Sequence, residues 1–172
     1  LSSKLRCQNN RMVEYLFADE IDPQTNEMVA RAVAAQQAFE DWSEARVDAL
    51  LKDLAEAIAA QASELAEATV TETGMGVVED KIAKIRFGSL DVFQGLTGQT
   101  ALGTIQTDYK RQITEIASPV GVVLGLIPLT NPVSTLIFKT LICLKGRNAL
   151  ILSCHRDALG VGNRTGEIIQ DV

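Results

Sequence analysis

A nearly continuous apolar run over residues 120–127 constrains the fold of this chain more than any other segment. Only two glycines interrupt the run, and Pro119 and Pro128 lie at its ends. Such a run predicts a strand buried on both faces, the kind of strand that a parallel sheet uses. A short polar turn follows, and Pro132 suits the first turn of a helix, where a backbone N–H is not needed.

The segment after this turn completes a β-α-β unit over residues 120–153. Apolar residues recur at helical spacing over residues 133–145, and Gly146 is expected to end this helix. Residues 149–152 are then predicted to form a second buried strand. The turn after the first strand lies at the carboxyl edge of such a sheet, where open α/β sheets bind ligands. We therefore predict an α/β fold with its candidate site at this turn.

Residues 23–95 are predicted to form helices that precede the sheet. Asp22 is a candidate N-cap for the first of them. Either Asp41 or Ser43 is expected to cap a long helix that ends near residue 73, before a sharp turn rich in glycine. A third helix starts near residue 78, and the side chains expected to face inward from it are Ile82, Ile85 and Leu90. Residues 1–20 have weak periodicity and are expected to form an irregular lead-in.

Residues 104–116 change to an alternating pattern, in which Ile105, Ile113 and Ile116 lie among polar residues. This pattern predicts a half-exposed strand or hairpin. An exposed strand edge can pair with a second chain, so this β-ribbon is either a subunit contact or a simple surface hairpin.

Composition and charge exclude several classes of protein. The chain has 172 residues, 47% hydrophobic and 22% charged, as expected for an ordinary globular domain. Its net charge of −6 argues against non-specific nucleic-acid binding, and no apolar run is long enough to span a membrane. Three cysteines without a CxxC pair, and the lack of a signal-peptide pattern, favour a cytoplasmic location and no metal centre.

The end of the sequence shows a helical pattern over residues 157–172 and no further strand. Two parallel strands alone make an incomplete core with uncovered apolar faces. We therefore expect residues 21–172 to be an incomplete domain from the N-terminal part of a larger enzyme.

Five blocks of sequence carry a family resemblance. In order, they are TGMGVVEDK at 73–81, GTIQ at 103–106, SPVGVVLGLIPLTNP at 118–132, STLIFKTLICLKGRNALILS at 134–153, and His155. Together they resemble the aldehyde dehydrogenase superfamily, and specifically its CoA-acylating branch of acetaldehyde dehydrogenases and bifunctional aldehyde–alcohol dehydrogenases. The resemblance implies part of an NAD-binding domain of modified Rossmann type and a β-ribbon that mediates oligomerisation. The implied reaction converts an aldehyde, CoA and NAD⁺ to acyl-CoA and NADH through a thioester on a catalytic cysteine.

The resemblance assigns the catalytic candidate, Asn131. The matching Asn of the family donates its side-chain N–H to the oxyanion that forms from the aldehyde. Removing one such donor typically costs on the order of 10²–10³ in rate. The alternative is that Asn131 only caps the following helix through its side-chain oxygen, because Asn-Pro often begins a helix.

The resemblance also implies two cofactor-binding segments. The residues that match the nicotinamide-ribose side of NAD are Leu126, Ile127, Pro128, Leu129, Thr130 and Asn131. Ser153 and His155 follow the second strand, where the family places the adenosine ribose. Non-acylating members usually have a Lys there, and its absence favours the acylating branch. Cys154 and Arg156 depart from the Ser-Pro-His-Pro that this branch commonly shows, and the usual GxGxxG fingerprint is absent.

Two other features have open interpretations. Cys154 beside His155 suggests a nucleophilic pair, but adjacent strand residues point to opposite sides and no third group orients them. Lys139 matches a Lys that the wider family keeps near the active site, and is equally well explained as a solvated Lys on an apolar helix.

The family's nucleophilic cysteine is expected beyond residue 172, since none of the three cysteines here has its sequence context. We therefore predict the N-terminal part of an NAD-dependent CoA-acylating aldehyde dehydrogenase that acts on a small aldehyde and CoA and is inactive alone. The alternatives are a non-acylating aldehyde dehydrogenase and a non-catalytic assembly module that forms a homo-oligomer through the 104–116 ribbon.

Overall fold

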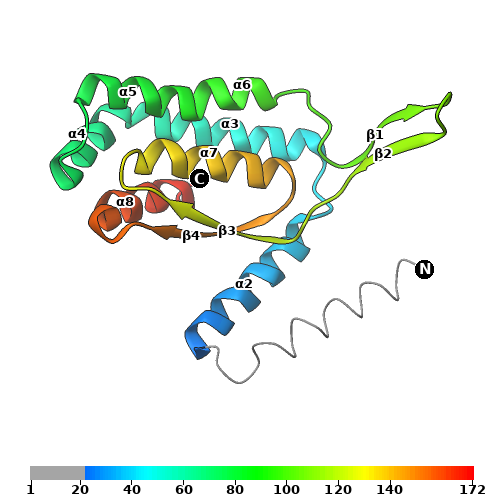
Figure 1. Cartoon of the computed structure of the whole chain (residues 1–172), viewed down its shortest axis with the longest axis horizontal. Helices are drawn as coiled ribbons and strands as arrows, with labels where there is room; N and C mark the ends of the chain where they lie inside the picture. The colour runs from blue at the N-terminus through cyan, green and yellow to red at the C-terminus, as the bar shows by residue number, and fades with distance from the viewer. Residues whose placement is uncertain (1–21) are drawn as a thin grey trace.

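The computed structural model describes residues 22–172, and the lead-in predicted for residues 1–20 lies outside them. Helices come first, a β-hairpin follows, and a β-α-β unit and a last helix complete the order (Figure 1). No helix within residues 22–172 is long and apolar enough to cross a membrane. The predicted α/β organisation is therefore present, with the parallel strands late in the chain.

The first helices begin at the predicted caps. α2, Pro23–Phe39, follows Asp22, whose carboxylate accepts a hydrogen bond from the Thr25 N–H at 3.1 Å. α3, Glu44–Ala60, is capped by Ser43 and not by Asp41. The hydroxyl oxygen of Ser43 accepts a hydrogen bond from the Arg46 N–H at 3.3 Å. Local cap chemistry thus places the start of α2, and for α3 the structure selects Ser43 from the two predicted candidates.

The single long helix predicted to end near residue 73 is wrong. The helix breaks at Gln61, which has φ −100° and ψ 12°, and α4, Ala62–Thr73, is a separate helix. Ile58 before the break and Leu65 after it are both fully buried in the same core. The break therefore allows the apolar faces of two helices to meet that core.

The third helix is interrupted by a π-helical turn. α5, Val78–Arg86, continues through this turn, η1, Phe87–Asp91, into α6, Val92–Leu96. Ile85 is buried as predicted, but the prediction for Leu90 is wrong, because its side chain is 38% exposed. A π-helical turn shifts the faces of the helix after it, and here Ser89 is buried instead of Leu90.

The core lies where α3, α7 and α8 meet, with α4 and α5 packed against them (Figure 1). α7 covers Pro132–Lys145 and α8 covers Leu159–Gln170, which starts after a short 3-10 turn, η2, Arg156–Ala158. The larger apolar side chains of this core are Val47, Leu51, Leu54, Ile58, Leu65, Ile85, Val133, Ile137, Leu141, Val161 and Ile168. Burying each contributes about 1.5–3 kcal/mol, so this core holds the first turn of α7 firmly in place.

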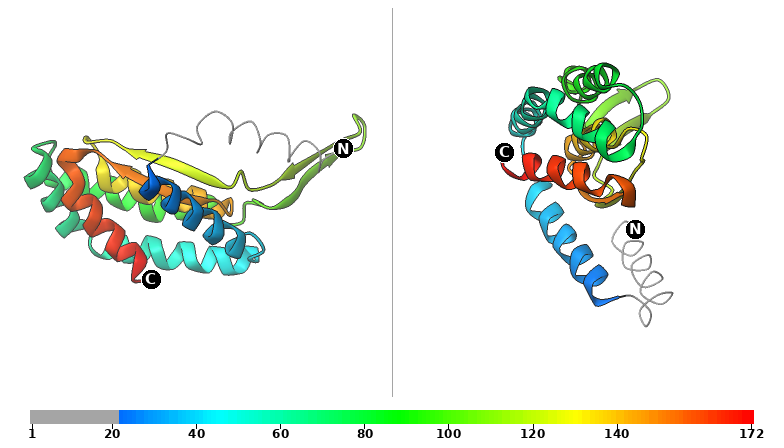
Figure 2. Two further views of the ribbon diagram at one scale, coloured as in Figure 1. Left: turned by 90° about the horizontal axis from the view of Figure 1, so that it is seen from below. Right: turned by 90° about the vertical axis from the view of Figure 1, so that its left-hand side faces the viewer.

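The β-α-β unit contains two parallel strands. β3, Val122–Ile127, pairs with β4, Ala149–Cys154, in a register that places Leu126 opposite Ser153. The prediction that the first strand is buried on both faces is wrong, because the described residues bury only one face of β3. Gly125 and Ile127 are buried on the α7 side, whereas Leu124 and Leu126 are more than 60% exposed. α2 packs mainly against β4 (Figure 2), so the second face of β3 has no such cover from the described residues.

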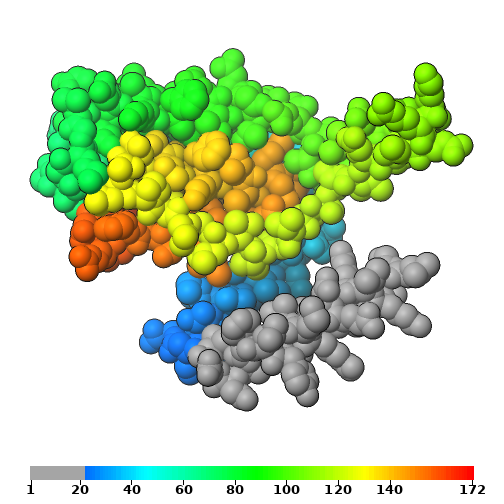
Figure 3. Space-filling model, viewed as in Figure 1, coloured from blue at the N-terminus to red at the C-terminus, as the bar shows by residue number. Residues whose placement is uncertain are grey.

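The ribbon predicted over residues 104–116 is a hairpin that projects from the body of the molecule (Figures 1 and 3). β1, Gly103–Asp108, pairs antiparallel with β2, Ile113–Ala117, with a register shift at Ile105. Ile105, Ile113 and Ile116 are each more than half exposed. The hairpin therefore presents apolar side chains on both of its strands.

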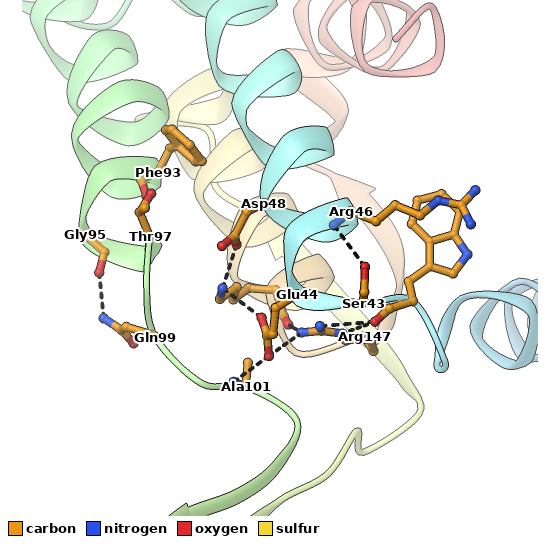
Figure 4. Close-up of polar contacts among 12 residues, drawn as sticks. Ser43, Glu44, Arg46, Asp48, Phe93, Gly95, Thr97, Gln99, Ala101 and Arg147 are labelled. Atoms are coloured by element: carbon orange, nitrogen blue, oxygen red, sulfur yellow. Dashed lines mark hydrogen bonds and ion pairs between the residues drawn. The ribbon is translucent and has the colours of Figure 1, made fainter.

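Glu44, the first residue of α3, ties the base of this hairpin to the body (Figure 4). One carboxylate oxygen, Oε1, accepts from the Ala101 N–H at 3.1 Å and lies 3.2 Å from Nη1 of Arg147. The other oxygen, Oε2, lies 3.0 Å from Nζ of Lys145, which also lies 2.6 Å from Oδ1 of Asp48. The segments before β1 and before β4 therefore share one carboxylate.

Candidate functional site

The ends of the two parallel strands bring the predicted site segments together. The Ile127 carbonyl accepts a hydrogen bond from the His155 N–H at 3.1 Å, beyond the last ladder pair between Ile127 and Cys154. The turn over residues 128–131 and the segment over residues 153–155 therefore share the carboxyl edge of the sheet. This is the edge at which α/β sheets bind ligands.

Asn131 is the last residue of the turn and the N-cap residue of α7. Its backbone has φ −145° and ψ 64°, and its carbonyl accepts from the Thr135 N–H at 3.2 Å. Its side chain makes no capping hydrogen bond to the helix. The alternative that the Asn131 side chain serves only as a helix cap is therefore wrong.

The side-chain oxygen of Asn131 instead accepts from Lys81 of α5, with Nζ and Oδ1 3.1 Å apart. Lys81 also donates to the backbone carbonyl of Thr130 in the same turn. The Lys81 side chain is buried, with only 6% of the residue exposed. Burial lowers the pKa of Lys81, and the nearby positive charge of Lys84 lowers it further.

Lys81 is the site residue that the sequence reasoning missed. It lies at the end of the 73–81 block, where it would be taken for a solvated lysine on a helix. The signal that could have found it is the glycine ahead of it. Gly76 has φ +83°, and a Cβ there would lie 2.8 Å from Cε of Lys81. The aliphatic part of the Lys81 side chain therefore packs directly against the backbone of this glycine.

A close helix contact sets the distance between α5 and α7. Gly88, in the π-helical turn, lies so near the first turn of α7 that a Cβ there would be 2.8 Å from the Ser134 carbonyl oxygen. Pro132 and Val133 of that first turn are buried. α5 and α7 therefore pack closely enough for Lys81 to reach the turn before α7.

The remaining predicted residues differ in accessibility. Leu126, Pro128, Thr130, Ser153 and His155 are exposed, Leu129 and Asn131 are half-buried, and Ile127 is buried. Nδ1 of His155 accepts from the Asp157 N–H at 3.2 Å. Ile127 thus belongs to the core, and the others are available at the edge of the sheet.

The Cys154–His155 pair is not a nucleophile and base in this geometry. The sulfur of Cys154 lies against Gly162 of α8, where a Cβ would be only 2.5 Å from it. Burial raises the pKa of the Cys154 thiol, and Glu72 raises it further; burial also raises the pKa of Cys143. Both thiols are therefore poor nucleophiles.

Lys139 is neither at the turn nor merely solvated. Its Nζ donates to the Leu126 carbonyl at 2.6 Å, which fastens α7 to β3 near the carboxyl end of that strand. No group of three or more His, Cys, Asp or Glu side chains suited to a metal ion occurs among the described residues.

An open groove between α2, β4 and α8 lies apart from the turn. Its lining includes Arg31, Ile151, Cys154 and Glu167 but no residue of the 126–131 segment. At the start of α8, the Gly160 and Val161 N–H groups donate to the carboxylate of Glu72 at 2.8 and 2.7 Å. This helix N-terminus is therefore already capped by a carboxylate and does not offer a phosphate site.

Comparison with known proteins identifies the family. The sequence model of the aldehyde dehydrogenase family matches residues 11–172 of this chain. The chain belongs to the aldehyde dehydrogenase family.

The relatives of this aldehyde dehydrogenase chain include a bifunctional aldehyde-alcohol dehydrogenase and an acetylating dehydrogenase. It is 37% identical to the bifunctional aldehyde-alcohol dehydrogenase of Escherichia coli strain K12 over 84% of the chain, and it covers 16% of that protein. It is 34% identical to the acetylating succinate-semialdehyde dehydrogenase of Clostridium kluyveri, over 83% of the chain and 32% of that protein. The chain thus spans less than a third of either relative.

A solved structure confirms the fold. The acetylating aldehyde dehydrogenase of Geobacillus thermoglucosidasius superposes with a TM-score of 0.81 at 38% identity, over 86% of this chain and 33% of that one. The predicted resemblance, and the prediction of N-terminal helices with a small parallel sheet of the aldehyde dehydrogenase fold, are both confirmed.

Proposed function

We propose that this chain forms the N-terminal part of an NAD-dependent, CoA-acylating aldehyde dehydrogenase. The observation that carries the proposal is the Asn131 side chain, which lies at the carboxyl edge of the sheet and is not used to cap α7. Similarity to enzymes described as acetylating supports the acylating reaction. The non-acylating alternative has no comparable support among these relatives.

In this proposal, Asn131 stabilises the developing negative charge on the aldehyde oxygen. Its oxygen accepts from Lys81, so its Nδ2 hydrogens are left to donate toward a bound carbonyl. Such a donor acts most strongly when it is fixed before the reaction. Neither Cys143 nor Cys154 is proposed as the nucleophile, because burial raises the pKa of both thiols and disfavours the thiolate.

NAD, when bound, supplies the acceptor for the hydride that leaves the aldehyde carbon. The residues proposed to hold its nicotinamide-ribose side are Leu126, Ile127, Pro128, Leu129, Thr130 and Asn131. Ile127 acts through its backbone position, since its side chain is buried. Ser153 and His155 are proposed to contact the adenosine ribose, and both are exposed beside the turn. The capped start of α8 fits a cofactor mode that does not use this helix N-terminus for phosphate.

The test is an assay of NADH formation from acetaldehyde, NAD⁺ and CoA. We expect no turnover by the 172-residue chain, and CoA-dependent turnover by the full-length protein that carries it. In that protein, Asn131→Ala should lower kcat by about 10²–10³. Asn163→Ala, an exposed Asn on α8, is the matched control. Turnover that does not require CoA, or an Asn131→Ala variant with unchanged kcat, would contradict the proposal.

We further propose that the β1–β2 hairpin is the homo-oligomer contact. Its exposed isoleucines, Ile105, Ile113 and Ile116, support this, because apolar side chains on a projecting ribbon favour burial against another surface. Ile116→Lys should reduce the mass measured by light scattering to that of a smaller species. The exposed Thr114→Lys on the same strand is the comparison. A wild-type protein that remains monomeric would refute the oligomer proposal.

A further inference from the structure

We propose that Lys81 is a positioning residue for Asn131: it holds the carboxamide oxygen and so fixes the direction in which the amide N–H groups point. This inference rests on the proposed function only in the claim that those N–H groups meet the substrate. The orientation itself is a property of the chain and can be tested without catalysis.

The chemistry of the two groups fixes the orientation of the amide. A lysine ammonium has three N–H donors and no acceptor, whereas a carboxamide has an accepting oxygen at one end and a donating nitrogen at the other. With Nζ 3.1 Å away, the oxygen of Asn131 has to face Lys81. The reversed amide would place N–H groups against N–H groups. The Nδ2 hydrogens therefore face away from α5.

The turn supplies both described oxygen acceptors of Lys81. Nζ donates to the Thr130 carbonyl and to the Asn131 side chain, and it forms no ion pair with a carboxylate in residues 22–172. A buried ammonium is costly unless it is hydrogen-bonded. Releasing Asn131 would therefore leave the cation less satisfied, and this cost holds the amide in one orientation.

The helices around Lys81 limit its freedom. Its stem passes against Gly76, and Ile85, one helical turn further along α5, is buried in the core. Gly88 lies against the Ser134 carbonyl, which keeps α5 and the start of α7 at close distance. The ammonium therefore reaches the turn from a fixed direction.

The same contact also affects how strongly Asn131 donates. A positive charge beside the carboxamide oxygen polarises the amide, and hydrogen bonds in such a chain strengthen one another. The alternative is that Lys81 only fastens the Thr130 carbonyl. In that case the Asn131 side chain would be as mobile in the wild type as it is after Lys81 is replaced.

The first test measures the Asn131 side chain by NMR in the 172-residue chain. Its Nδ2 signals are identified as the pair that is lost in Asn131→Asp. We expect a rigid side chain in the wild type, with an order parameter of about 0.85, and a flexible one below about 0.6 in Lys81→Met. Lys81→Arg should restore rigidity, and Lys84→Met, an exposed lysine on the same helix, should leave it unchanged.

An Asn131 side chain that is equally rigid in Lys81→Met would overturn the inference. If Lys81→Met does not fold, the wild type and Lys81→Arg decide, since a flexible Asn131 side chain in the wild type would also overturn the inference. A rigid wild-type side chain whose rigidity survives in Lys81→Arg supports it.

The second test uses kinetics in the full-length protein that carries this chain. Lys81→Met should lower kcat by about 10–10² with the KM for NAD⁺ within roughly twofold, because the lost interaction acts on the transition state. If Asn131→Ala abolishes activity while Lys81→Met does not, the inference fails and the proposed function stands. If neither variant affects kcat, the proposed role of Asn131 fails, and the NMR result alone decides on Lys81.

Discussion

Arg147 is completely buried and lies 3.2 Å from Glu44, although the two residues are far apart in the sequence. The guanidinium also donates to the Trp42 carbonyl from Nε and Nη2, at 3.3 and 3.2 Å, and to the Lys145 carbonyl at 2.7 Å. A single side chain therefore joins the α2–α3 connection to the end of α7, just before β4.

Replacing Arg147 by Met should destabilise the chain strongly. The change leaves the Trp42 and Lys145 carbonyls without their buried donor, while Glu44 keeps Lys145 as a partner, so we expect a loss of about 1–3 kcal/mol in the free energy of unfolding. Arg156→Met is the control, because that side chain is 86% exposed and should change stability by less than about 0.5 kcal/mol. Urea unfolding followed by circular dichroism measures both. Equal midpoints would show that the buried network contributes nothing.

The pH dependence of stability should depend on Glu44. Burial alone would raise its pKa, but hydrogen bonds from Ala101, Lys145 and Arg147 outweigh this effect and hold the pKa below its ordinary value of 4.5. A lowered folded-state pKa contributes stability above pH 4.5 that is lost as the pH falls through the folded pKa. Glu44→Gln should therefore be less stable at pH 7 and lose less stability on acidification. Parallel curves for the two proteins between pH 7 and 3 would refute this.

Glu72 should act as the cap of α8 from a different helix. Its carboxylate accepts from the Gly160 and Val161 N–H groups. Glu72→Ala leaves both donors without it, and we expect a loss of about 0.5–2 kcal/mol, as for other helix caps. Glu67→Ala, an exposed Glu on the same helix, is the matched control. Thermal unfolding of the two variants at one pH compares them, and the cap role requires the lower midpoint in Glu72→Ala.

The close approach of α5 to α7 predicts opposite effects for two glycine substitutions. Gly88→Ala would place a Cβ 2.8 Å from the Ser134 backbone oxygen and should cost about 1–3 kcal/mol. Gly95→Ala, in α6, meets no atom within 4 Å and should stabilise by about 0.4–1 kcal/mol. Chemical unfolding distinguishes them by the sign of the change. A stabilising Gly88→Ala would mean that the helices separate at low cost.

Features that depend on neighbouring residues could be predicted from the sequence. The caps at Asp22 and Ser43, the first turn at Pro132 and the stop at Gly146 all follow from local backbone chemistry. The first of the two parallel strands follows from a run of apolar residues between Pro119 and Pro128. The position of Asn131 at the carboxyl edge of the sheet follows from these elements.

Features that depend on distant partners could not be predicted. Lys81, Lys145 and Arg147 look like surface cations in the sequence, yet each is buried because its partners come from other elements. The break at Gln61 and the π-helical turn before α6 likewise depend on how each helix meets the core. The spacing of apolar residues within one helix does not show how that helix packs against the core.

The glycine in the middle of β3 has a consequence for strand alignment. A Cβ at Gly125 would lie 3.0 Å from the Leu150 side chain and 3.5 Å from the Lys139 side chain, so even a methyl group would make a tight contact with Leu150 there. Slipping β3 by one residue would turn Leu124 or Leu126 into that space. Gly125 thus favours the observed register between β3 and β4, and this register sets the position of the turn that carries Asn131.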